Sequence, residues 1–290
     1  MEEKIRYGKD GFPYGYTAIT EENGRHRDML MDFGILRLAA GQVFEECRPQ
    51  EAAYLLINGD VMAEWEGCRE EMRRSNCFDE GMWVLHVPAG THVKLTGIGP
   101  DTEMAIQATV NPTHFSARLY KPEDVPDENR GAGTMKETCT RIVRTVLDYR
   151  LAPWSKLVLG EVINTPGKWS SYPPHIHPQP EIYYYRFTPE NGYGYSEYGD
   201  EVIKVHNRDT IFISPNLTHP QVATPGNALW YLWVIRHLDD DPYRAPAYPY
   251  TLPDHAYLLK PDAPIWPFTS RPSLPTRPLP PQSVKDTGPK

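Results

Sequence analysis

The chain has few cysteines and no long apolar run. Its 290 residues include four cysteines, none of them in a C-x-x-C pair, so we expect free thiols and neither a disulfide framework nor a thiolate metal site. No stretch approaches the roughly 18 apolar residues of a membrane span. The segment from Met1 to Arg6 contains no apolar signal sequence. We therefore expect a soluble protein of the reducing cytoplasm that has no membrane partner.

Positive charge is also scarce. Thirty lysine and arginine residues stand against 38 aspartate and glutamate residues, for a formal net charge of −8 at pH 7. Such a chain is a poor partner for a nucleic-acid backbone or an anionic membrane surface. An anionic sugar acid would need a local cluster of basic side chains. The sequence also lacks the glycine-rich fingerprints that bind dinucleotides or phosphates, so no redox cofactor is expected.

Proline and glycine, by contrast, are abundant. The chain contains 30 prolines and 21 glycines, and 40% of its residues are hydrophobic. This composition is typical of many short strands joined by turns, and it predicts an all-β protein. The length allows one large domain or two ordinary ones, of which two is the favoured interpretation.

The strongest chemical signal lies between Trp169 and Pro220. His175 and His177 are two residues apart, which places both imidazoles on one face of an extended segment. Glu181 opens the aromatic strand that follows, and a later strand ends in a turn that carries His219. Three imidazoles and one carboxylate suit one divalent transition ion, with positions left open for water or substrate. Zn²⁺ is the preferred candidate, and Mn²⁺ or Fe²⁺ would fit the same donors.

A related pattern occurs earlier in the chain. The spacing of Pro88 and His92 equals that of Pro215 and His219, which suggests an internal repeat. The first copy has no H-x-H pair, and glutamates stand where its metal ligands would have to come from. We expect no metal there, and we expect His92 to be a structural residue. These glutamates are Glu45, Glu46 and Glu51. We assign a second histidine of this region, His86, to the core.

These motifs carry a family resemblance. The histidine and carboxylate pattern resembles that of cupins, small β-barrels that hold a metal on inward-facing strand residues. More narrowly, the chain resembles the bacterial 5-deoxy-glucuronate isomerases of inositol catabolism, which belong with the 4-deoxy-5-ketouronate isomerases. The chain departs from the family in two respects: Ile176 and Pro178 stand where the family usually has a charged pair, and the proline-rich tail beyond Asp241 is longer than is usual in the family. The likeness spans about Asp32 to Asp239 and is carried by WSSYPPHIH ending at His177, by E-x-YYYRF starting at Glu181, and by Arg130-Gly-Ala-Gly.

The resemblance implies two cupin-type β-barrels, a bicupin, followed by a proline-rich tail. Strand and turn patterns place the first, degenerate barrel at residues 29–115 and the second, metal-binding barrel at 138–240. A polar linker at 116–137 connects them. Residues 1–28 are expected to be an irregular arm. Residues 241–290 are expected to be extended over the surface at first and disordered past Ser270.

The catalytic base is less well defined by the sequence. Tyr183 and Tyr185 share the face of Glu181, and a phenol near a metal can lose its proton more easily than a free one. Lys168 and His206, at strand ends, are alternatives. For substrate binding we consider Arg186, Arg236, Lys168 and His206, since arginine can clamp a carboxylate through two hydrogen bonds. By strict alternation Arg186 points outward, so its inclusion rests partly on the resemblance.

The expected reaction is a metal-dependent aldose–ketose isomerisation of 5-deoxy-glucuronate to 5-dehydro-2-deoxy-gluconate through an enediolate. Polarisation of the carbonyl acidifies the neighbouring C–H bond, and the proton returns to the former carbonyl carbon. Alternatives are isomerisation of 4-deoxy-5-ketouronate, an Fe²⁺ dioxygenase, and a sugar-binding barrel without catalysis. A homodimer or larger homo-oligomer would cover exposed sheet edges.

Overall fold

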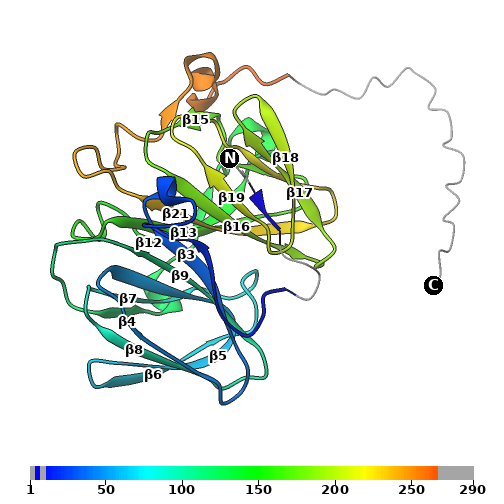
Figure 1. Cartoon of the computed structure of the whole chain (residues 1–290). Coiled ribbons are helices and arrows are strands. Elements are labelled where there is room, and N and C mark those ends of the chain that lie inside the picture. Colours follow the sequence, from blue (N-terminus) through cyan, green and yellow to red (C-terminus); the bar gives the residue numbers. More distant parts are fainter. Residues whose placement is uncertain (1–3, 7–10, 267–290) are drawn as a thin grey trace, which may run out of the picture.

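The computed structural model describes residues 4–6 and 11–266, and their regular structure is almost entirely β. Two β-structures follow one another along the chain, one from Gly15 to Tyr120 and one from Glu128 to Arg236. We call them the first half and the second half. In Figure 1 the first half, in blue and cyan, lies below the second half, in green and yellow. The predicted all-β class is confirmed.

The first half is a nine-stranded sheet that is folded over on itself by its longest strand. The N-terminal part of β5 pairs with β7 and β9, and its C-terminal part pairs with β6 and β8. Gly59 lies between these parts at φ +101°, and a Cβ there would come within 2.6 Å of the Thr102 backbone, so only glycine fits this bend. The strands are β2 (Gly15–Thr20), β3 (Asp32–Leu38), β4 (Val43–Cys47), β5 (Glu51–Trp65), β6 (Cys68–Arg74), β7 (Trp83–Val87), β8 (His92–Gly97), β9 (Thr102–Thr109) and β10 (Arg118–Tyr120).

The second half contains a seven-stranded sheet in the order β1-β19-β16-β21-β13-β12-β11 and a four-stranded sheet in the order β14-β20-β17-β18. Strand β15 pairs separately with β22, from the C-terminal segment. The strands are β1 (Lys4–Ile5), β11 (Glu128–Arg130), β12 (Arg141–Leu147), β13 (Leu157–Asn164), β14 (Trp169–Ser170), β15 (His175–Ile176), β16 (Glu181–Thr188), β17 (Tyr193–Tyr198), β18 (Glu201–His206), β19 (Thr210–Ile213), β20 (Gln221–Ala223), β21 (Ala228–Arg236) and β22 (Tyr250–Thr251).

The helical structure is limited to short 3-10 turns. None of the helices in the described part of the chain has the length and apolar character needed to cross a bilayer. All four cysteines are free, as predicted. The turns are η1 (Arg27–Met29), η2 (Pro122–Asp124), η3 (Met135–Glu137) and η4 (Pro253–Leu259).

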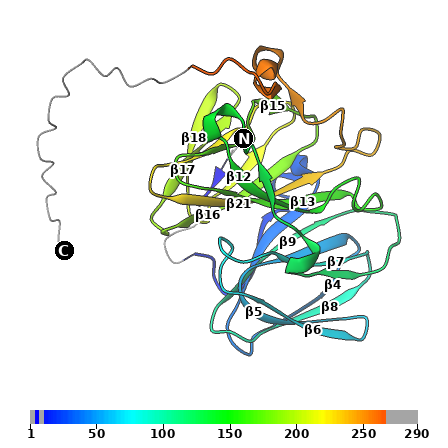
Figure 2. The same ribbon diagram turned by 180° about the vertical axis from the view of Figure 1, so that it is seen from behind.

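Alternation along the strands separates the apolar core into three layers. On β16, Ile182 and Tyr184 join a cluster shared by both halves, whereas Tyr183 and Tyr185 join a cluster inside the second half. On β3, Phe33 belongs to the shared cluster, while a third cluster fills the first half. The two sheets therefore pack against each other through their outer faces, as the two views of the ribbon also indicate (Figures 1 and 2). Each fully buried aliphatic or aromatic side chain there contributes about 1.5–3 kcal/mol.

Buried ion pairs also connect the two halves. Arg186 on β16 approaches Glu103 on β9, with Nη1 and Oε1 2.9 Å apart, and the Tyr184 hydroxyl donates to the same carboxylate at 2.6 Å. Arg74 of the first half and Glu161 of the second form a fully buried pair at 2.7 Å. Such charges are tolerated in an interior because each is paired and hydrogen-bonded.

Several expectations about the connecting segments need correction. Residues 15–20, predicted to lie in an irregular arm, form β2 and pair with β3. The predicted linker 116–137 contributes β10 to the first half and β11 to the second. Residues 241–266, which were expected to extend over the surface, lie over the end of the second half that carries β15 (Figure 1). The predicted disorder past Ser270 concerns residues outside the described part of the chain.

Candidate metal centre

Three of the four predicted metal ligands converge inside the second half. Donor atoms of His177, Glu181 and His219 all lie within 4.8 Å of one another. The Glu181 Oε2 atom is 3.2 Å from His177 Nε2 and 3.3 Å from His219 Nε2. All three side chains are buried. Residues from β16 and from the loops before β16 and β20 thus meet at one point, although they are up to 42 positions apart in sequence (219 − 177).

His175 borders this group from the neighbouring strand β15. Its ring centroid is 4.9 Å from that of His219, and the two rings meet edge to face. His175 is partly exposed, whereas His177 and His219 are buried. It does not belong to the set of atoms within 4.8 Å of one another, so its placement beside the set makes it a fourth potential ligand on the open side.

The backbone fixes the same tautomer in all three histidines. Nδ1 lies 2.9 Å from the Pro173 carbonyl oxygen in His175, 2.9 Å from that of Gln179 in His177, and 2.8 Å from that of Leu217 in His219. A carbonyl can only accept, so each Nδ1 carries the proton and each Nε2 presents a lone pair. This is how protein histidines are oriented for a metal.

When Glu181 is ionised, its carboxylate and the Nε2 atoms of the histidines are all hydrogen-bond acceptors, and none of them carries a proton to donate. Burial lowers the pKa of His175 and His177 to about 4 and that of His219 to about 3, which keeps the imidazoles neutral. Burial raises the pKa of Glu181 to about 7, against the opposing effects of His219 and Tyr183. Two neutral imidazoles and a buried carboxylate that converge, with a third neutral imidazole beside them, fit a divalent ion, which would compensate the carboxylate charge.

A small cavity of about 240 Å³ opens beside the converging atoms. We call it the metal cavity. It is lined by all four predicted ligands and by Tyr183, whose hydroxyl lies 3.1 Å from Ser171 Oγ. Burial raises the pKa of Tyr183 well above its usual value. Of the predicted catalytic residues, Tyr183 is the one that the structure brings to the metal cavity.

Tyr185 and Lys168 lie elsewhere. The Tyr185 hydroxyl donates to Gln221 Oε1 at 2.6 Å in the core of the second half. The Lys168 ammonium group donates to the backbone oxygen of Glu137 on the protein surface. Neither residue lines the metal cavity.

The predicted substrate-binding residues also lie outside this cavity. Arg186 faces the first half, as alternation predicted, and binds Glu103. Arg236 donates to Asp239 Oδ1 at 2.9 Å, and His206 lies 2.7 Å from an Arg6 guanidinium nitrogen. Each is already engaged by other residues, so the assignment of a substrate carboxylate to them has no support in the arrangement of the site.

Two arginines that the sequence reasoning did not assign to the site line the metal cavity instead. Arg130 on β11 and Arg141 on β12 are direct cross-strand neighbours. Arg130 is paired with Glu128 at 2.8 Å, and Arg141 donates to the Cys139 carbonyl at 2.9 Å. Arg130 opens the motif on which part of the resemblance rests, and this was the available signal.

Tyr243 was missed because it belongs to the proline-rich segment. Its ring packs edge to face against His177, with centroids 5.0 Å apart, and it lines the metal cavity. The segment is held there by backbone pairing of β22 with β15 and by a 2.6 Å hydrogen bond from Gln179 Nε2 to the Asp241 carbonyl. Residues 241–259 therefore form part of the cavity wall.

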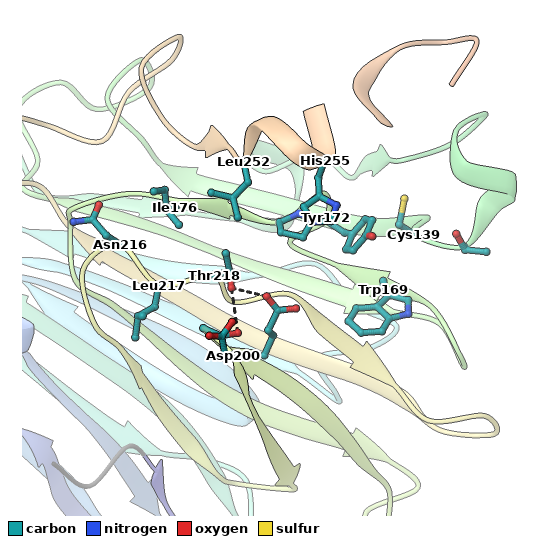
Figure 3. Close-up of a pocket in the computed structure, with 14 residues that line it drawn as sticks. Cys139, Trp169, Tyr172, Ile176, Asp200, Asn216, Leu217, Thr218, Leu252 and His255 are labelled. Carbon is teal, nitrogen blue, oxygen red and sulfur yellow. Dashed lines mark hydrogen bonds between the residues drawn. The ribbon is translucent and has the colours of Figure 1, made fainter. Parts of the chain in front are cut away.

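A second, larger cavity adjoins the metal cavity, and Figure 3 shows its lining. Its volume is about 930 Å³. Tyr172 lines both cavities. In Figure 3 the side chains of Tyr172, Leu252 and His255 lie above those of Thr218 and Asp200, and Trp169 lies to the right.

Comparisons with known proteins show the family of the chain. The sequence model of the KduI/IolB family matches residues 8–257. The 5-deoxy-glucuronate isomerase of Geobacillus kaustophilus is 30% identical over 222 residues, which cover 70% of this chain and 78% of that protein. The enzyme of the same name from Bacillus licheniformis is 26% identical over 270 residues, covering 85% and 94%.

Solved structures support the same fold. The crystal structure of an IolB-like protein from Salmonella typhimurium has a TM-score of 0.73 at 23% identity and covers 86% of this chain and 97% of that one. An oxalate decarboxylase from Lactobacillus farciminis has a TM-score of 0.60 at 10% identity, covering 81% and 86%. At these identities the likeness concerns the fold alone.

Proposed function

The chain belongs to the KduI/IolB family and is an enzyme of the isomerase class like its curated relatives, and from this premise we propose that it isomerises 5-deoxy-glucuronate to 5-dehydro-2-deoxy-gluconate. The reaction would serve inositol catabolism. The observation that carries the proposal is the convergence of His177, Glu181 and His219 beside a cavity that also contains two arginines. We further propose that the two halves are the barrels of a bicupin.

One divalent ion would be held by the Nε2 atoms of His175, His177 and His219 and by the Glu181 carboxylate. Zn²⁺ is the preferred candidate, with Mn²⁺ or Fe²⁺ as alternatives. When bound, the ion supplies Lewis-acid chemistry that polarises a carbonyl and acidifies the adjacent C–H bond. The donor set supports this assignment, because Nε2 of His177, Nε2 of His219 and one Glu181 oxygen converge, and His175 lies beside them with its Nε2 free of the proton.

Arg141 is the best candidate to bind the carboxylate of the sugar acid. Arg130 and Arg141 face each other across β11 and β12, and like charges directly opposite each other in a sheet are destabilising. A carboxylate between them would relieve that repulsion and accept paired hydrogen bonds. Arg130 is already paired with Glu128, so Arg141 has more capacity to bind a ligand.

The isomerisation moves one proton between adjacent carbons. A base removes the proton from the carbon next to the aldehyde, and the electron pair passes to the carbonyl oxygen to give an enediolate of the sugar. A second proton passes from the hydroxyl on that neighbouring carbon to the former carbonyl oxygen, and the first proton is returned to the former aldehyde carbon, which leaves a ketone and a primary alcohol. The reaction needs no external oxidant or reductant. Tyr183 and Tyr243 lie on the cavity wall and are our candidates to hold and return this proton.

The experiment is to incubate the protein with each sugar acid and follow the aldehyde signal by NMR. We expect loss of the aldehyde of 5-deoxy-glucuronate and no conversion of 4-deoxy-5-ketouronate. Arg141→Gln should raise KM about 10- to 100-fold, because a charge-assisted hydrogen bond contributes about 1.5–3 kcal/mol. Conversion of the ketouronate alone would reassign the substrate, and an unchanged KM in Arg141→Gln would remove the arginine from the proposed site.

A further inference from the structure

The second cavity and the metal cavity share a common wall. Neighbouring residues of this wall line opposite cavities, as expected where successive side chains of an extended chain point to opposite sides. The wall thus separates the predicted ligands from a volume of about 930 Å³, within the usual range of about 300–1,000 Å³ for small-molecule sites. The pairs, with the metal-cavity residue first, are His175 and Ile176, His219 and Thr218, and Thr251 and Leu252.

One side of the second cavity is aromatic. Trp169 on β14 and Tyr172 just after it have ring centroids 5.9 Å apart at an interplanar angle of 55°. The Trp169 side chain is 36% exposed although it is large and apolar. Both rings lie to the right of Thr218 in Figure 3. Aromatic faces of this kind supply large contact areas to the C–H faces of a ligand.

The opposite side presents oxygen atoms. The Thr218 hydroxyl donates to Glu197 Oε1 at 2.5 Å, which orients that carboxylate at the cavity wall. Asp200, in the turn after β17, lies close to Thr218 in Figure 3. Within the described part of the chain, the side chains of Asp200 and Asn216 make no hydrogen bond to protein atoms. These groups are free to bind hydroxyl groups of a ligand.

The charge of the lining restricts what can bind. Among the described residues that line the second cavity, two carry carboxylates and none is lysine or arginine. The metal cavity, by contrast, contains Arg130 and Arg141. A ligand with its own carboxylate would be repelled by Glu197 and Asp200, whereas a ligand with several hydroxyl groups could donate to both.

We propose that the second cavity binds a neutral polyhydroxylated molecule of about the size of a monosaccharide. Its C–H face would pack on Trp169, and its hydroxyl groups would donate to Glu197 and Asp200. The proposal does not rest on the isomerase assignment, because it concerns a different cavity and is read out by binding.

The test is saturation-transfer difference NMR on the full chain with D-glucose and D-glucuronate, which differ at one carbon. We expect saturation transfer to glucose. Trp169→Ala should weaken glucose binding about tenfold, and Asp200→Asn, in an exposed turn, about threefold. Trp154→Ala is the matched control, because Trp154 is similarly exposed at 37% but does not line this cavity, and it should leave glucose binding unchanged.

The outcomes separate the possibilities. Loss of glucose binding in Trp169→Ala supports the proposal, with any glucuronate binding unchanged because an acid would bind beside the arginines of the metal cavity and not against Trp169. No transfer to glucose in the wild type, or equal glucose binding in the wild type and both cavity variants, overturns it. Because glucose binding is measured without turnover, a failure here leaves the isomerase test untouched.

Discussion

The first and second halves contain the same proline–histidine spacing, but the histidine lies in a different environment in each half. Both contain a proline followed four residues later by a histidine, at Pro88 and His92 and at Pro215 and His219. The His92 side chain is 63% exposed and lies 3.8 Å from Glu45 on the surface, whereas His219 is buried against Glu181. We expected His92 to be a structural residue, but it lies on the surface, where an exposed ion pair contributes little to stability.

The interiors of the two halves also differ in the types of side chain that fill them. The first half is filled mainly by aliphatic and methionine side chains such as Leu56 and Met104. The interior of the second half is rich in tyrosine and surrounds a cavity with three histidines. His86, the first-half histidine assigned to the core, is buried and lies 2.7 Å from Glu51. The same proline–histidine spacing thus leaves a histidine on the surface of the first half and buries a histidine against Glu181 in the second half, and the two interiors differ in their side-chain chemistry.

The largest expected effect comes from truncating the two turn histidines. His219→Ala should reduce bound metal from about one ion per chain to near none and lower kcat/KM by more than about 100-fold, because a ligand is lost. His92→Ala should change neither quantity. Metal analysis after dialysis and the aldehyde-loss assay measure both. Equal loss of metal in the two variants would contradict the assignment of the metal site to the second half alone.

An intermediate effect is expected where the halves meet. Arg186→Ala removes the closer of the two arginine partners of buried Glu103 and leaves Arg208, whose Nε lies 3.5 Å from Glu103 Oε2. Loss of such a charge-assisted hydrogen bond costs about 1.5–3 kcal/mol in the free energy of unfolding. Urea denaturation gives this value, and Arg150→Ala, at an exposed position, serves as the control that should unfold like the wild type. A raised KM in Arg186→Ala without loss of stability would return Arg186 to the substrate site.

The smallest expected effect is a pH dependence in the first half. Burial opposes ionisation of Glu51, but His86, the Lys156 N–H group and the Ser155 hydroxyl outweigh it and lower its pKa below the usual 4.5. Ionised Glu51 therefore stabilises the protein above pH 4.5, and this contribution is lost as pH falls through the lowered pKa. Glu51→Gln should flatten the acid limb of stability measured by urea denaturation. If the free energy of unfolding of this variant falls as steeply at low pH as that of the wild type, other carboxylates cause the acid dependence.

The sequence predicted those features that depend on short-range periodicity. Spacing placed His175 and His177 on one segment, and alternation correctly turned Arg186 away from Glu181. The convergence of His219 with them followed from recognising the strand and turn before it. The all-β class followed from turn residues and β-branched runs.

Features that depend on distant chain segments could not be predicted. Arg141 reaches the metal cavity because β12 lies in the same sheet as β16, an order that no local pattern encodes. Tyr243 lies in a segment whose composition suggested no packed structure, yet pairing of β22 with β15 brings it to His177. Lys168 ends on a surface carbonyl because the turn that carries it faces outward.

The most direct measurement is turnover before and after removal of the metal. The protein is stripped with a chelator, dialysed and assayed by NMR with 5-deoxy-glucuronate, then reloaded with Zn²⁺, Mn²⁺ or Fe²⁺ in separate samples. We expect no aldehyde loss in the stripped protein and recovery with one equivalent of a suitable ion, and no recovery in His177→Ala. Full turnover by stripped protein that retains no ion would contradict the assignment of the site to metal-assisted isomerisation.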